Sequence, residues 1–229
     1  EKYHWYTKTT MDKTSVYEDI RRQIVDERLA PGQWLIEREL CESYRMSRTP
    51  IREILWKLAA DGFLEQEANR GFVVRRLGLE QIFEIFQARE AIEGMAARLA
   101  CRRGGEAFHA RLREIKKKIS GADIAADPAK GIGLGREMHR AIMEAAHNRI
   151  MGDINERLEN LTVLTANITK RAPVIEKASA DAHINIINAL LQRDEEKSEQ
   201  LMREHLRETC RNVVEQFYPG MLEPAAGTK

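Results

Sequence analysis

Residues 45–60 read RMSRTPIREILWKLAA, and this stretch decides the fold of the first third of the chain. Its apolar side chains recur at helical spacing, which places them in one stripe along a helix: Ile51, Ile54, Leu55, Leu58 and Ala59. Ser47 is a suitable N-cap, and Pro50 is tolerated in a first turn. The stretch therefore predicts an amphipathic helix that begins just after Ser47.

The face opposite this stripe is basic. Arg48 and Arg52 stand four residues apart and therefore on one side of the helix, and Thr49 lies beside them near its start. Residues 45–57 carry four basic side chains and a single acidic one, Glu53. Such a face is typical of a helix that reads the major groove of DNA, but also of an ordinary solvated helix surface. The flanking sequence has to decide between these interpretations.

The flanking sequence predicts two further helices and a hairpin. Apolar residues at helical spacing end before the Pro-Gly pair at 31–32 and indicate one helix, and a shorter helix is expected over residues 37 to about 44. Downstream, residues 63–64 and 72–74 flank an Asn/Gly turn at residues 68–71 and predict two short strands. Three helices followed by a hairpin are the layout of a winged helix-turn-helix.

A winged helix-turn-helix would bind double-stranded DNA through its third helix, its second helix and the tip of its hairpin. The third helix offers its N-terminal side chains to base edges in the major groove, where arginine suits bidentate contact with guanine. The second helix and the hairpin tip would add contacts to the backbone or minor groove, because glycine allows close approach of the main chain. The candidate residues are Arg38, Arg48, Thr49, Arg52, Arg70 and Gly71.

The composition indicates a globular chain of one or two domains. Its 229 residues are 43% hydrophobic and 32% charged, which argues against a disordered or membrane protein. No run of about 18 apolar residues occurs, and residues 1–14 lack the features of a signal peptide, so we expect no membrane partner and a cytoplasmic location. Three widely spaced cysteines argue against a disulfide framework or a cysteine-based zinc site. The net charge of +1 means that any DNA affinity depends on where charge is placed.

We expect four segments along the chain. Residues 1–14 form an N-terminal arm, and residues 15–76 form the winged helix-turn-helix. From Leu79 onward the helical periodicity is nearly continuous, which predicts an all-helical domain over residues 79–219. Residues 220–229 are expected to form a flexible tail. The fold class is thus mainly α, with a small β-hairpin wing.

Two of the six histidines are expected to lie level in a helical hairpin. Asp194 heads an Asp-Glu-Glu run, a good N-cap, and so marks the join between two helices. His183 precedes it by eleven residues and His205 follows it by eleven, so each lies on the order of 16 Å from the turn. His139, on an apolar-spaced helix, would supply a third imidazole. A single helical histidine is more often a packed core or surface residue, and that alternative stays open.

The N-terminal unit resembles the DNA-binding domain of the GntR family of bacterial transcription regulators. Residues 29–40 read LAPGQWLIEREL and residues 46–53 read MSRTPIRE; LAADGFL at 58–64 and NRGF at 69–72 follow. The match covers about residues 15–76. It implies DNA contacts at the residues already named and adds the N-cap residue of the third helix, Ser47; the full set is Arg38, Ser47, Arg48, Thr49, Arg52, Arg70 and Gly71.

The helical unit resembles the FCD domain of the FadR-like branch of that family, on the motif from Arg89 to Glu93. The resemblance implies an antiparallel helical bundle that binds a small carboxylic acid effector. It also implies that Arg89 meets the effector carboxylate, since arginine and carboxylate form bidentate pairs. Arg136, three residues before His139, is near enough in helical phase to face the same cavity, and either binds an acidic effector or is solvated.

Many FCD domains hold a divalent metal such as zinc, nickel or manganese through an aspartate and three histidines. The three histidine positions correspond to His139, His183 and His205, but the aspartate position is Gly135. An octahedral ion would then keep three neutral nitrogen ligands, with solvent or effector in the other positions. We expect either a weakened metal site or a cavity that recognises its ligand through Arg89 or Arg136 without metal.

These observations predict a homodimeric transcription repressor controlled by a small organic acid. A two-fold dimer binds a palindromic operator, and an effector that changes the half-site spacing spoils that binding. Two alternatives stay open: a metal-dependent hydrolase that uses the three histidines, and a regulator that senses the metal itself. The sequence contains no HExxH, GxSxG or phosphate-binding glycine loop, so we expect no enzymatic activity.

Overall fold

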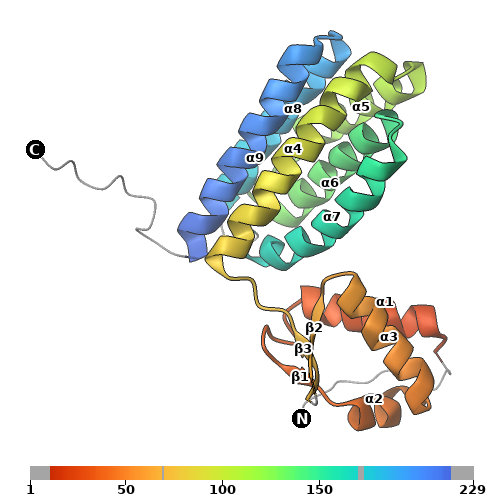
Figure 1. Ribbon diagram of the computed structural model, residues 1–229. Coiled ribbons are helices and arrows are strands. Elements are labelled where there is room, and N and C mark those ends of the chain that lie inside the picture. Colours follow the sequence, from red (N-terminus) through yellow and green to blue (C-terminus); the bar gives the residue numbers. More distant parts are fainter. Residues whose placement is uncertain (1–10, 69, 170–172, 218–229) are drawn as a thin grey trace, which may run out of the picture. The chain divides into compact units, whose positions relative to one another are not determined.

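The computed structural model describes residues 11–68, 70–169 and 173–217 and divides the chain into two compact units, Glu1–Leu77 and Gly78–Lys229 (Figure 1). Residues 1–10 of the expected arm and the expected tail at residues 220–229 lie outside the described residues. The first helix begins at Lys13. None of the described helices combines the length and the apolar character that crossing a membrane requires.

The first unit is a winged helix-turn-helix, which confirms the predicted fold. Its elements follow the order α1 (Lys13–Val25), β1 (Trp34–Leu35), α2 (Glu37–Tyr44), α3 (Arg48–Ala60), β2 (Leu64–Glu67) and β3 (Gly71–Val74). The apolar stripe of α3 is buried, with Ile51, Leu55 and Leu58 fully enclosed. Ser47 stands at the N-cap position of α3, although its side chain makes no capping hydrogen bond.

The wing contains one strand more than the sequence indicated. β3 pairs antiparallel with β2 and, on its other edge, with β1, so the sheet order is β1-β3-β2. β1 has only two residues, Trp34 and Leu35, and two residues carry no periodicity that a sequence pattern can reveal. On the wing, the ring of Phe72 packs edge-on against Trp56 of α3, with 5.3 Å between the ring centroids. The wing and α3 therefore support one another.

The second unit is the expected all-helical bundle, which surrounds one apolar core. Figure 1 shows α4 between α9 and helices α5 to α7; α4 makes its most extensive packing with α9, and α8 packs against α9, α6 and α5. The helices are α4 (Leu79–Arg103), α5 (Glu106–Ser120), α6 (Pro128–Ala145), α7 (Arg149–Thr169), α8 (Pro173–Leu191) and α9 (Glu195–Phe217).

The turn between α8 and α9 sets the register of these two helices. Asp194 caps α9, because its carboxylate accepts a hydrogen bond from the Lys197 amide at 3.0 Å, as the acidic run predicted. Arg193 adopts a left-handed conformation with φ of 58°, which reverses the chain. His183 on α8 and His205 on α9 are equally distant from this turn along the sequence and therefore face one another across the hairpin.

Candidate functional site

The exposed basic face of the first unit lies on α3 and its neighbours. Ser47, Arg48, Thr49 and Arg52 are all exposed at or near the start of α3. Arg38 is exposed on α2, Arg70 is exposed between β2 and β3, and Gly71 begins β3 with φ of 102°. The structure thus places the three α3 residues on one solvent face, and Arg38, Arg70 and Gly71 on flanking elements. That they touch DNA stays a prediction.

An ion pair that the sequence did not reveal orients Arg52. Its Nε donates to both carboxylate oxygens of Glu37, at 2.9 and 2.8 Å, so α2 holds a side chain of α3. The two residues are fifteen positions apart, and no sequence pattern joins them. Arg52 is therefore partly ordered before any nucleic acid binds.

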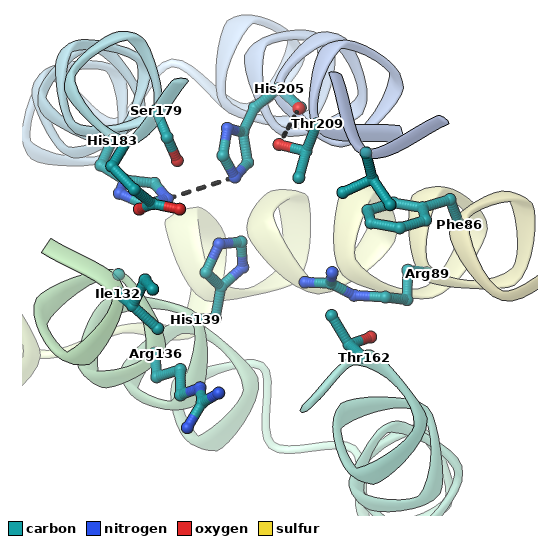
Figure 2. A pocket seen from close by; sticks show the side chains of 13 residues that line it. Phe86, Arg89, Ile132, Arg136, His139, Thr162, Ser179, His183, His205 and Thr209 are labelled. Atoms are coloured by element: carbon teal, nitrogen blue, oxygen red, sulfur yellow. Dashed lines mark hydrogen bonds between the residues drawn. The ribbon is translucent and has the colours of Figure 1, made fainter. Parts of the chain in front are cut away.

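Three buried imidazoles converge in the second unit. His139 comes from α6, His183 from α8 and His205 from α9, and each offers one nitrogen within 4.8 Å of the others. The Nε2 atoms of His183 and His205 are 3.2 Å apart. Figure 2 shows the three rings gathered between the helices. The sequence placed two of these residues level with one another, and the folded chain brings all three together.

The three histidines form a cluster that could hold a metal ion. Two nitrogens bound to one ion at about 2.0–2.1 Å lie about 3.0–3.4 Å from each other, which matches the His183–His205 spacing. Burial holds the pKa of both imidazoles well below its usual value, with the neighbouring His139 and Arg89 adding to the effect. Both rings are therefore neutral, the form that binds metal.

Glu93 on α4 reaches the cluster from the side, although the sequence did not single it out as a site residue. One of its oxygens accepts from Arg89 Nε at 2.6 Å, and the other lies 2.5 Å from His139 Nδ1. Burial by itself would raise the pKa of Glu93, but the positive Arg89 and the imidazole of His139 outweigh it and hold the pKa well below its usual value. The spacing of Arg89 and Glu93, one helical turn apart, was the signal available in the sequence.

A cavity of about 110 Å³ adjoins the three rings. In Figure 2 the guanidinium of Arg89 points toward the cluster, whereas that of Arg136 is turned away from it. Arg136 lines the cavity but is exposed, so the contact predicted between Arg136 and a ligand would lie at the mouth of the cavity. The sequence missed four polar lining residues: Glu176, Ser179 and Thr209, which lie one or two turns from a histidine on their own helix, and Thr162 on α7.

Gly135 also lines this cavity, and its missing side chain has a structural reason. A Cβ atom at position 135 would lie 2.5 Å from Cε1 of His183, far inside van der Waals contact. The imidazole of His183 therefore occupies the space in which a side chain at position 135 would begin. Replacing this glycine requires His183 to move.

Two family comparisons cover both units. Residues 13–74 match the bacterial regulatory proteins of the gntR family, and residues 84–208 match the FCD domain. The chain belongs to the FCD branch of the GntR family. The matched families and the relatives are transcription regulators and not enzymes, so the alternative of a metal-dependent hydrolase is set aside. The FCD match includes the three histidines, Arg89 and Gly135.

Individual relatives agree with this assignment. The "Nta operon transcriptional regulator" of Aminobacter aminovorans is 29% identical over 191 residues, covering 81% of this chain and 86% of its own. The "Glc operon transcriptional activator" of Escherichia coli K12 is 28% identical over 224 residues, covering 86% and 87%. A solved structure of E. coli McbR/YncC superposes with a TM-score of 0.75 at 24% identity, over 92% of this chain and 100% of that one. The structural likeness shows a shared fold.

Two glycines of α6 provide a matched test of the packing of His183 in the GntR–FCD regulator. A Cβ atom at Gly133 would meet nothing within 4 Å, so Gly133→Ala should raise the free energy of unfolding by about 0.5–1 kcal/mol through helix propensity. Gly135→Ala forces His183 to move and should lower it by about 1–3 kcal/mol. Urea unfolding of both variants measures the difference. Equal stabilisation by the two alanines would contradict this account of position 135.

Proposed function

We propose that this GntR–FCD regulator is a homodimeric repressor that binds a palindromic operator and releases it when a small carboxylate enters the cavity beside the three histidines. The carrying observation is the convergence of His139, His183 and His205 next to a small cavity. Drug-sized ligands need cavities of roughly 300–1,000 Å³, so a cavity of about 110 Å³ favours an effector of only a few carbon atoms.

The chemistry of the lining supports a carboxylate as the effector. The guanidinium of Arg89, which also pairs with Glu93, lines the cavity together with the hydroxyl groups of Ser179 and Thr209 and the carboxylate of Glu176. His139, His183 and His205 would hold a divalent metal, which when bound supplies positive charge and open positions for oxygen ligands. The residues present fit such an ion, because each of the three histidines offers one nitrogen within 4.8 Å of the others, and burial lowers the pKa of His183 and His205.

The exposed face of α3 supports DNA binding by the first unit. Arg48, Thr49 and Arg52 present two guanidinium groups and a hydroxyl at the N-terminal end of a helix whose other side is fully buried. This is the end that a recognition helix inserts into the major groove. A two-fold pair of such helices reads a palindrome, and repression follows if the effector changes their spacing.

Removal of the α3 guanidinium groups should weaken specific operator binding. Arg48→Ala and Arg52→Ala are each expected to weaken binding roughly 5- to 150-fold, because a good bidentate base contact contributes about 1–3 kcal/mol. The probe is a duplex that the protein itself selects from a randomised pool, in a mobility-shift assay at fixed salt. Arg28→Ala, at an exposed position of the same unit away from α3, is the control. Unchanged binding by the α3 variants would refute the assignment.

The metal part of the proposal predicts about one divalent ion per chain. Elemental analysis after dialysis against zinc, nickel or manganese should find that ion in the wild type, and His183→Ala should lose it. Absence of metal from the wild type would instead favour direct recognition of the acid by Arg89 or Arg136.

Operator release separates effector sensing from direct metal sensing, the second candidate that the three-histidine geometry favours. We expect metal-loaded protein to bind operator until a two- to four-carbon hydroxy or oxo acid is added, with a response lost in His183→Ala. The measurement is operator affinity by fluorescence anisotropy with metal alone, acid alone and both. A full response to metal alone would identify a metal sensor.

A further inference from the structure

Glu93 lies between the guanidinium of Arg89 and the histidine cluster. It is 2% exposed, and its carboxylate contacts Arg89 on its own helix and His139 on α6. Arg89 and His139 are themselves buried, at 7% and 9% exposed. Both carboxylate oxygens are thus engaged within the bundle, one by each neighbour. Such an arrangement fixes the orientation of every group in it.

The contact to His139 determines which ring nitrogen carries the proton. A carboxylate beside a guanidinium only accepts hydrogen bonds, so the 2.5 Å contact requires a hydrogen on Nδ1 of His139. With that hydrogen on Nδ1, Nε2 is the nitrogen of His139 left to bind an ion together with nitrogens of His183 and His205. Glu93 therefore sets the tautomer that the cluster needs for a metal ion.

Position 135 cannot contribute a charge to the cluster, because the ring of His183 fills the space of its side chain. Glu93 brings a carboxylate to the cluster from another helix. Its two oxygens already bind Arg89 and His139, so this carboxylate would support the metal ligand His139 and would not itself bind a metal ion. A carboxylate in that place raises the basicity of the imidazole through which it acts.

We propose that Glu93 is the positioning residue of the metal site. It holds His139 as the Nδ1–H tautomer, directs the Nε2 lone pair toward the ion shared with His183 and His205, and supplies the negative charge that position 135 does not. This inference rests on the metal part of the proposed function. Arg89 in turn holds Glu93, which links the cavity wall to the metal ligands.

The test is metal affinity of the full chain, measured by competition with a chromophoric chelator. Glu93→Gln removes the charge at nearly constant volume and should weaken cobalt(II) or zinc binding about 10- to 100-fold, with a changed cobalt absorption spectrum. Glu90→Gln is the matched control, because Glu90 is a carboxylate on the same helix that pairs with Arg207 instead of the cluster. It should bind metal like the wild type.

A second variant guards against a failure to fold. Glu93→Gln leaves Arg89 buried without its charged partner, whereas Arg89→Leu with Glu93→Leu removes both charges and the oxygen that accepts from His139 Nδ1. In metal-free protein labelled with ¹⁵N-histidine, we expect His139 to show Nδ1–H in the wild type and in Glu90→Gln. The double variant should lose this fixed tautomer and bind metal as weakly as Glu93→Gln.

The outcomes distinguish this inference from the proposed function. If the wild type binds metal and Glu93→Gln or the double variant binds it equally well, the positioning role is refuted and the metal site stands. If His139 keeps the same tautomer without Glu93, the role is also refuted. A wild-type protein that binds no metal overturns the metal part of the proposed function and this inference with it.

Discussion

A buried positive charge that must be paired organises the interior of the helical unit. The guanidinium of Arg89 is nearly enclosed in the bundle, and arginine side chains carry a positive charge. Glu93, one turn further along α4, pairs with it and at the same time contacts His139. α4 and α6 are joined through these groups. Removing one partner of such a buried pair typically costs about 3–5 kcal/mol, so the chain of contacts constrains the fold as well as the site.

The histidine cluster depends on this constraint and on two features of backbone geometry. The Asp194-capped turn sets the register of α8 and α9, which brings His183 and His205 face to face. Gly135 allows the ring of His183 to approach α6 closely. Around these polar groups the core is apolar and includes small residues such as Ala141 and Ala180, which let the helices pack tightly. A polar site enclosed in this way responds strongly to a small change in charge, because little water screens it.

The charged groups of the DNA-binding unit differ from those of the helical unit in their exposure to solvent. Its functional charges are exposed, so their interactions are screened by salt and each contributes little to stability. Order comes from neighbouring elements: Glu37 of α2 holds Arg52, and the Phe72 ring on the wing packs against Trp56 of α3. The apolar stripe of α3 fixes the helix against its own unit and leaves the basic face free for a ligand.

The sequence by itself determined the local elements and the families. Periodicity located α3 and its buried stripe, the Asn/Gly turn located the hairpin, and the acidic run at Asp194 located the join between two long helices. The same spacing placed His183 and His205 level, because helical rise is constant. Motifs at residues 29–40 and 46–53 identified the GntR domain, which the family match over residues 13–74 confirms.

Only the tertiary structure decided which distant residues meet. The pairing of β1 with β3, the Glu37–Arg52 ion pair and the contact of Glu93 with His139 join positions that no local pattern relates. From the sequence, Gly135 was interpreted as the loss of a metal-binding aspartate. In the fold, this glycine provides the space that the imidazole of His183 occupies. The physical reason is that periodicity reports which face of an element is buried, but the packing of several elements fixes what each buried group touches.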